Sequence, residues 1–180
     1  MAIVNVTAMT ELTAPADADV FYVVDDPGSS ALPRKITWAN IVQKAYGEVS
    51  VNGASAAQSL SASTWTKLTA FTAEGQYKNT TVSHSNDKIT VTNAGVYLVN
   101  LMVSFTTGAA TDATLAVYYN GSVTAAKTNR TTAASTDIAG VAASAIVSAT
   151  AGTDFELYAN LGDATTITTK DATLTVVRVG

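Results

Sequence analysis

The chain has 180 residues, of which 47% are hydrophobic and 13% are charged, about half of the usual ~25% charged fraction, and its net charge is −4. Because the ten Lys and Arg residues are scattered, the composition excludes the basic patch of a nucleic-acid-binding protein. No stretch approaches the ~18 consecutive apolar residues of a spanning helix, so we expect no membrane insertion. The start, MAIVNVTAMTE, lacks the pattern of a secretion signal, and the absence of cysteine excludes disulfides.

Residues 1–46 form the first predicted region. DVFYVV is rich in β-branched and aromatic residues, Pro27 and Gly28 suit a turn, and RKITW is a second strand, which together predict a β-hairpin. Thr37 can cap a short helix in which apolar residues recur at helical spacing, ending at Gly47. The apolar positions of that helix are Trp38, Ile41, Val42 and Ala45. A unit of this size has too small a core to stand alone, so it should need a docking surface.

The rest of the chain divides into a linker and an all-β domain. Residues 47–64 are small and polar with little periodicity, and we interpret them as a linker. Residues 65–180 carry short strand-like segments between turn signals, which indicates a sandwich or barrel. Asn120-Gly121 is a hairpin signal. The predicted strands lie near 65–72, 77–83, 87–92, 95–106, 112–119, 122–128, 138–148, 154–160 and 171–179.

The strand at 95–105 has two apolar faces. One face carries Tyr97 and the alternate residues up to Phe105, all of them apolar, and the opposite face carries Leu98, Asn100 and Met102. A strand of this kind needs burial on both sides. A neighbouring subunit could cover the second face, and so could a loop of a monomeric sandwich.

Residues 65–180 resemble the jelly-roll superfamily of tumour necrosis factor and the complement globular heads. The resemblance is carried by Ala94-Gly95-Val96-Tyr97-Leu98-Val99, by Ala151-Gly152 before the strand Phe155–Ala159, and by the closing strand Thr173–Gly180. It implies a C-terminal jelly-roll β-sandwich that assembles as a homotrimer. In such a trimer, Leu98, Asn100 and Met102 are the expected interface residues.

Residues 9–46 resemble the N-terminal segments of bacteriophage tail-fibre and head-fibre proteins. The matching pattern is Val24-Asp25-Asp26-Pro27, a Gly/Ser loop, Arg34-Lys35-Ile36-Thr37 and a short apolar helix. The resemblance implies a virion surface protein that is made in the host bacterial cytoplasm and attaches to capsid or tail proteins through this segment. The candidate attachment residues are Phe21, Tyr22, Val23, Trp38 and Ile41.

The sequence offers no converging catalytic groups, so we expect no enzyme, cofactor or metal site. His84 is the single histidine and lies in a predicted turn, SHSND. Asp25 and Asp26 are adjacent on a strand, point apart and suit turn capping. Asp154 and Glu156 share a strand face and could bind a cation, but a solvated outer face explains them more simply.

Two functions remain open from the sequence. The first is a homotrimeric capsid decoration protein or short head fibre, anchored by residues 1–46. The second is a tail-fibre or receptor-binding tip that recognises host surface glycan. Aromatic residues could stack on a sugar there: of the adjacent Tyr118 and Tyr119, one should face the core and one should point outward, whereas Trp65 is expected to plug the base of the head.

Overall fold

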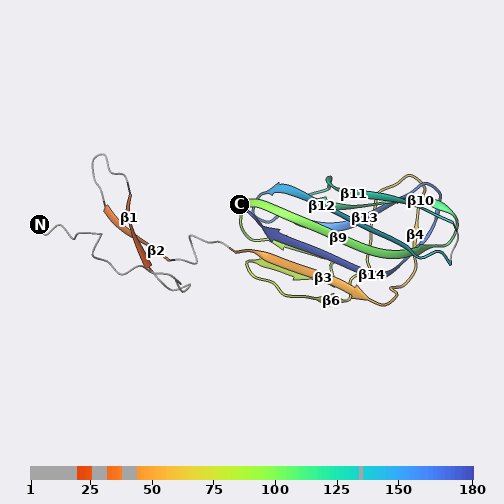
Figure 1. Ribbon diagram of the computed structural model, residues 1–180, viewed down its shortest axis with the longest axis horizontal. Helices are drawn as coiled ribbons and strands as arrows, with labels where there is room; N and C mark the ends of the chain where they lie inside the picture. The colour runs from red at the N-terminus through yellow and green to blue at the C-terminus, as the bar shows by residue number, and fades with distance from the viewer. Residues whose placement is uncertain (1–19, 26–31, 38–43, 134–135) are drawn as a thin grey trace, which may run out of the picture. The chain divides into compact units, whose positions relative to one another are not determined.

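A computed structural model of the chain describes residues 20–25, 32–37, 44–133 and 136–180 (Figure 1). The chain divides into two compact units, residues 1–43 and residues 44–180. The described residues contain no helix. The predicted helix falls mainly on residues 38–43, which lie outside the described residues, and Lys44 and Ala45 after them are not helical.

The first unit holds the predicted hairpin. Strands β1 (Val20–Asp25) and β2 (Leu32–Thr37) pair antiparallel, with Val20 opposite Thr37 and Asp25 opposite Leu32. The prediction of two strands is therefore confirmed, as is their pairing, and the predicted turn at Pro27 and Gly28 lies outside the described residues.

The second unit is a sandwich of two antiparallel sheets, as predicted. The first, which we call the β9 sheet, has the order β12-β9-β14-β3-β6, with β4 beside β14 (Figure 1). Its strands are β3 (Tyr46–Asn52), β4 (Gln58–Leu60), β6 (Ala73–Glu74), β9 (Gly95–Thr107), β12 (Ala139–Ala149) and β14 (Thr165–Arg178).

The second sheet, the β10 sheet, has the order β11-β10-β13-β8-β7, with β5 beside β13. Its strands are β5 (Thr66–Lys67), β7 (Thr80–Ser83), β8 (Lys88–Val91), β10 (Thr111–Tyr119), β11 (Ser122–Thr132) and β13 (Asp154–Leu161). The hairpin predicted at Asn120-Gly121 joins β10 to β11, and both turn residues have positive φ (45° and 77°), as such a two-residue turn requires.

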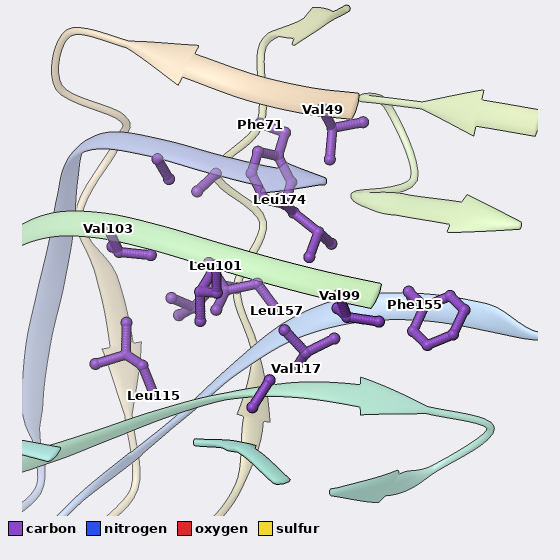
Figure 2. Packing of buried hydrophobic residues seen from close by; sticks show 14 of the residues in the cluster. Val49, Phe71, Val99, Leu101, Val103, Leu115, Val117, Phe155, Leu157 and Leu174 are labelled. Atoms are coloured by element: carbon purple, nitrogen blue, oxygen red, sulfur yellow. The ribbon is translucent and has the colours of Figure 1, made fainter. Parts of the chain in front are cut away.

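The core lies between the two sheets. The face of β9 that carries Leu101 points toward Leu157 on β13 and Leu115 on β10, and all three side chains are at most 1% exposed (Figure 2). Tyr97 and Phe155 add an aromatic contact, with ring centroids 6.3 Å apart. Period-2 alternation of apolar residues in each strand supplies this interior.

The predicted linker over 47–64 is wrong, because these residues belong to the sandwich. In GEVSVN the alternate residues Val49 and Val51 are buried in the core at 0% and 2% exposure, and β3 pairs with β14 along its length. Gly47 lies where β3 passes close to the other sheet: a Cβ there would stand 2.7 Å from Thr80 Oγ1. The head therefore begins at Lys44 rather than at residue 65.

Residues 58–74, which we call the strap, close one side of the sandwich. The strap runs from β4 beside β14 to β5 beside β13 and returns to β6 beside β3, so it links the two sheets on the side away from β11 and β12. Leu60, Leu68 and Phe71 of the strap are buried. The strand predicted over 65–72 is correspondingly short, because the chain turns into the core after Lys67.

Asp87 holds the strap in place. Its Oδ1 accepts a hydrogen bond of 2.8 Å from the Phe71 backbone N–H, and the Ala70 N–H also bonds to this carboxylate. The residue is 6% exposed, and burial raises the pKa of its carboxyl above the ordinary 3.8 although these hydrogen bonds oppose the change. Asp87 therefore contributes most when it is protonated, and this contribution is lost as the pH rises through the raised pKa.

We predict that Asp87→Ala destabilises the fold by about 1–3 kcal/mol, because it leaves two buried N–H groups without an acceptor. Asp87→Asn keeps an acceptor without the charge and should remain within about 1 kcal/mol of wild type. Because Asn does not ionise, the free energy of unfolding of the Asn variant should increase relative to that of wild type as the pH rises above 3.8. Urea denaturation at several pH values measures this, with exposed Asp163→Ala as the control. Equal loss in the Ala and Asn variants would contradict the role of the acceptor.

Candidate assembly face

The outer face of the β9 sheet brings together side chains from four strands in register. Leu98 lies between Ile146 on β12 and Val177 on β14, and Tyr46 on β3 completes this apolar row. The next row is polar: Ser144, Asn100, Thr175 and Glu48. Two further rows follow: Ala142, Met102, Thr173 and Ser50, then Gly140, Ser104, Asp171 and Asn52. We call these four rows the assembly face.

The assembly face leaves large apolar side chains in contact with solvent. Met102 is 65% exposed and Ile146 is 70% exposed, whereas Leu98 is partly exposed. The opposite side chains of β9, from Tyr97 to Phe105, are at most 4% exposed. Within the described part of the chain, no loop covers Met102, so the second apolar face of β9 is not explained by burial inside one copy of the head.

Sequence reasoning identified part of this face. It named Leu98, Asn100 and Met102, and the structure places all three together on it. It missed Ile146 and Val177, because only the strand register shows that these residues flank Leu98. The signal available was weak: Ile146 is the large apolar residue on the otherwise small and polar face of AGVAASAIVSA.

A shallow depression of about 460 Å³ opens on the assembly face. Met102 and Ala142 give it apolar walls, and Asn52, Ser104 and Asp171 form a polar end. The Asp171 carboxylate accepts hydrogen bonds from the Gly53 N–H at 3.0 Å and from the Ser104 hydroxyl at 3.3 Å. A bulge in β14 between Thr169 and Asp171 sets the register at which Asp171 points outward.

The acidic residues of β13 lie on the outer face of the β10 sheet. Glu156 pairs with Lys67 at 2.5 Å and Asp154 pairs with Lys88 at 2.8 Å. Partial burial opposes ionisation of Asp154, but hydrogen bonds from Lys88 and Thr90 outweigh it and hold the pKa of this carboxyl below 3.8. The pair shares a face as predicted, and each carboxylate is neutralised by a lysine rather than free to bind a cation.

The other candidate residues are dispersed. His84 lies in the β7–β8 turn, where its Nδ1 is 3.1 Å from Glu74 Oε1. Asp25 ends β1, and Asp26 lies outside the described residues. No group of three His, Asp or Glu residues that could hold a metal ion occurs among the described residues, and no helix in this part of the chain could span a membrane.

Three aromatic rings form a cluster on the outer side of the β10 sheet. Tyr118 stacks on Tyr158 with ring centroids 4.1 Å apart and contacts Trp65 of the strap at 5.4 Å. Tyr119 instead stacks on Phe155 of the core at 6.3 Å. The two adjacent tyrosines therefore face opposite sides, as expected, and Trp65 covers a sheet face rather than the base of the head.

The candidate attachment residues divide between described and undescribed parts. Phe21, Tyr22 and Val23 lie on β1, opposite Ile36, Lys35 and Arg34. Trp38 and Ile41 lie outside the described residues.

No family model matches the sequence, and no curated protein matches it either. Among solved structures, the globular domain of the zebrafish complement 1qA protein has a TM-score of 0.50 and 14% identity, covering 76% of this chain and 98% of that chain. Murine APRIL at pH 5.0 has a TM-score of 0.50 and 12% identity, covering 74% and 99%. The PRD1 vertex protein P5 has a TM-score of 0.48 and 14% identity, covering 94% and 86%.

The first two similarities define the fold class. The head is a jelly-roll sandwich like the complement 1qA globular domain and APRIL, which confirms the architecture expected from the sequence. At identities this low, the similarity shows the fold alone.

We predict that aspartate separates the two faces of β9. Leu101→Asp should abolish folding, because an unpaired charge in the core costs several kcal/mol. Leu98→Asp should keep the strand content but prevent assembly, and exposed Thr81→Asp on β7 should do neither. Circular dichroism and light scattering distinguish the three variants. Normal assembly of Leu98→Asp would mean that this face is not an interface.

Proposed function

We propose that the protein is a structural component of a bacteriophage virion, a homotrimeric capsid decoration protein or short head fibre that is anchored by its N-terminal segment and projects its jelly-roll head. The single observation that carries the proposal is the assembly face: an apolar row and exposed Met102 on the central strands of the head. The phage assignment rests on the sequence resemblance of residues 9–46.

Covering the assembly face would stabilise an oligomer. Burial of a side chain such as Leu98, Met102 or Ile146 is worth about 1.5–3 kcal/mol when it is complete, and symmetry repeats that gain in each subunit. The weakly charged surface adds little electrostatic repulsion between copies. A closed ring of three copies would leave no apolar face unpaired.

The N-terminal unit would provide the attachment. Its hairpin is small, and a unit of this size gains stability when it docks on a larger surface. We propose that Phe21, Tyr22, Val23, Trp38 and Ile41 contact capsid or tail proteins. The protein would then be made in the bacterial cytoplasm and be located on the virion surface.

A second candidate is a tail-fibre or receptor-binding tip that recognises host glycan. The partly exposed rings of Trp65 and Tyr158 favour it, since aromatic faces beside polar groups suit sugar stacking. Immunogold labelling of the virion separates the two candidates, because a decoration protein labels the head and a receptor-binding tip labels the tail.

We predict that the purified protein is a homotrimer at micromolar concentration, because three copies together bury the assembly face. Multi-angle light scattering gives the mass directly. A stable monomer would contradict both the trimer and the function given to Leu98.

We also predict that the two units act separately in attachment. Residues 44–180 should form trimers but fail to bind virions that lack the protein, whereas the full chain should bind them. Residues 1–43 fused to an unrelated trimeric head should bind as well, because threefold linkage raises avidity without new contacts. Decoration by the isolated head as efficient as that by the full chain would place the anchor elsewhere.

A further inference from the structure

The two sides of the sandwich are closed differently. The strap covers one side with buried Leu68 and Phe71, but the other side ends in the edge strands β11 and β12, which lie next to each other. Each of these strands pairs with a single neighbour, and the inward side chains of β12 remain partly exposed: Val141, Ala143 and Ala145. Unpaired edge strands beside partly exposed apolar residues form a surface that another chain could cover.

Arg130 gives this open side a positive charge. It lies on β11 opposite the buried Ala113, so the alternation of the strand points it toward the side of the sandwich interior, although it is exposed at the edge. Within the described part of the chain, Arg130 makes no ion pair. By contrast, Lys127 lies opposite Ala116 on the outer face of the β10 sheet.

Asp171 gives the assembly face the complementary charge. It is exposed at the polar end of the depression, and its two printed hydrogen bonds leave acceptor positions free on the carboxylate. Among the described residues, Asp171 also makes no ion pair. The depression therefore combines apolar walls with one carboxylate, which suits a cationic side chain with an apolar stem.

Arg130 and Asp171 lie at nearly the same height along the strands. A hydrogen bond of 2.6 Å between the Thr107 and Thr132 hydroxyls joins β9 to β11 at one end of the sandwich. Arg130 precedes Thr132 by two residues, and Ser104, the partner of Asp171, precedes Thr107 by three residues. At about 3.3 Å per residue, the two heights differ by about one residue.

We propose that the open β11–β12 side of one copy packs onto the assembly face of the next copy, with Arg130 placed in the depression against Asp171. This deepens the proposed homotrimer and rests on it. In this ring the threefold axis runs along the strands of the heads. Rotation about such an axis leaves the height of each residue unchanged, so residues at equal height meet. The contact is heterologous, edge against face, so a threefold rotation closes it into a ring.

Charge reversal tests the pair. In full-length protein, Arg130→Glu and Asp171→Arg should each raise the concentration at which half of the trimer dissociates by about tenfold or more, because like charges would then face each other. The double variant should return to within about threefold of wild type. Lys127→Glu is the matched control and should leave assembly unchanged. Sedimentation equilibrium measures the dissociation, and circular dichroism verifies the fold.

The outcomes separate this inference from the proposed function. A wild-type protein that is monomeric overturns the homotrimer and the pair together. A wild-type trimer in which the single reversals have no effect, or in which the double variant is as weak as the weaker single variant, overturns only the pair. If Asp171→Arg fails to fold, Asp171→Asn and Arg130→Gln form the cycle instead. Their combination should then cost no more than either variant alone, and additive losses would overturn the pair.

Discussion

The structure depends on the burial of one face of β9. This strand pairs with β12 on one side and β14 on the other, and its Tyr97, Leu101 and Phe105 side chains fill the centre of the sandwich. Because successive side chains of a strand point to opposite faces, each residue of β9 that points into the core places the next residue on the outer face. The exposed Met102 is therefore a consequence of the same pairing that places Leu101 in the core, and a one-residue slip would exchange the two sets.

The asymmetry of the sandwich follows from how the chain returns between its sheets. The strap seals one side with its own apolar residues and with the carboxylate of Asp87, so that side is complete within one copy. The β11–β12 side has no such segment in the described part of the chain. In the proposed ring, Asp171 on the assembly face and Arg130 at the open edge would provide complementary charges between identical subunits.

The outer face of the β10 sheet differs from the assembly face in its chemistry. There, Lys67 and Lys88 neutralise the β13 carboxylates, and the rings of Tyr118 and Tyr158 stack on each other. On this face the carboxylates are thus paired with lysines and the large rings are packed against each other inside one copy. This contrast supports placing the proposed interface on the outer face of the β9 sheet rather than on the outer face of the β10 sheet.

The sequence alone determined most of the strands, because alternating apolar residues between Gly, Asn and Thr signals have a local cause that is visible in any window. It also determined the hairpin turn at Asn120-Gly121, where the backbone needs positive φ. It failed at 47–64, where Val49 and Val51 are set among small polar residues and the strand is held by distant β14. The alternation in β9 predicted that Leu98 lies on the outer face, but the sequence did not show that Ile146 and Val177 flank it. Register, the closure of one side by the strap and the depression at Asp171 depend on contacts between residues far apart in the chain, so only the tertiary structure decided them.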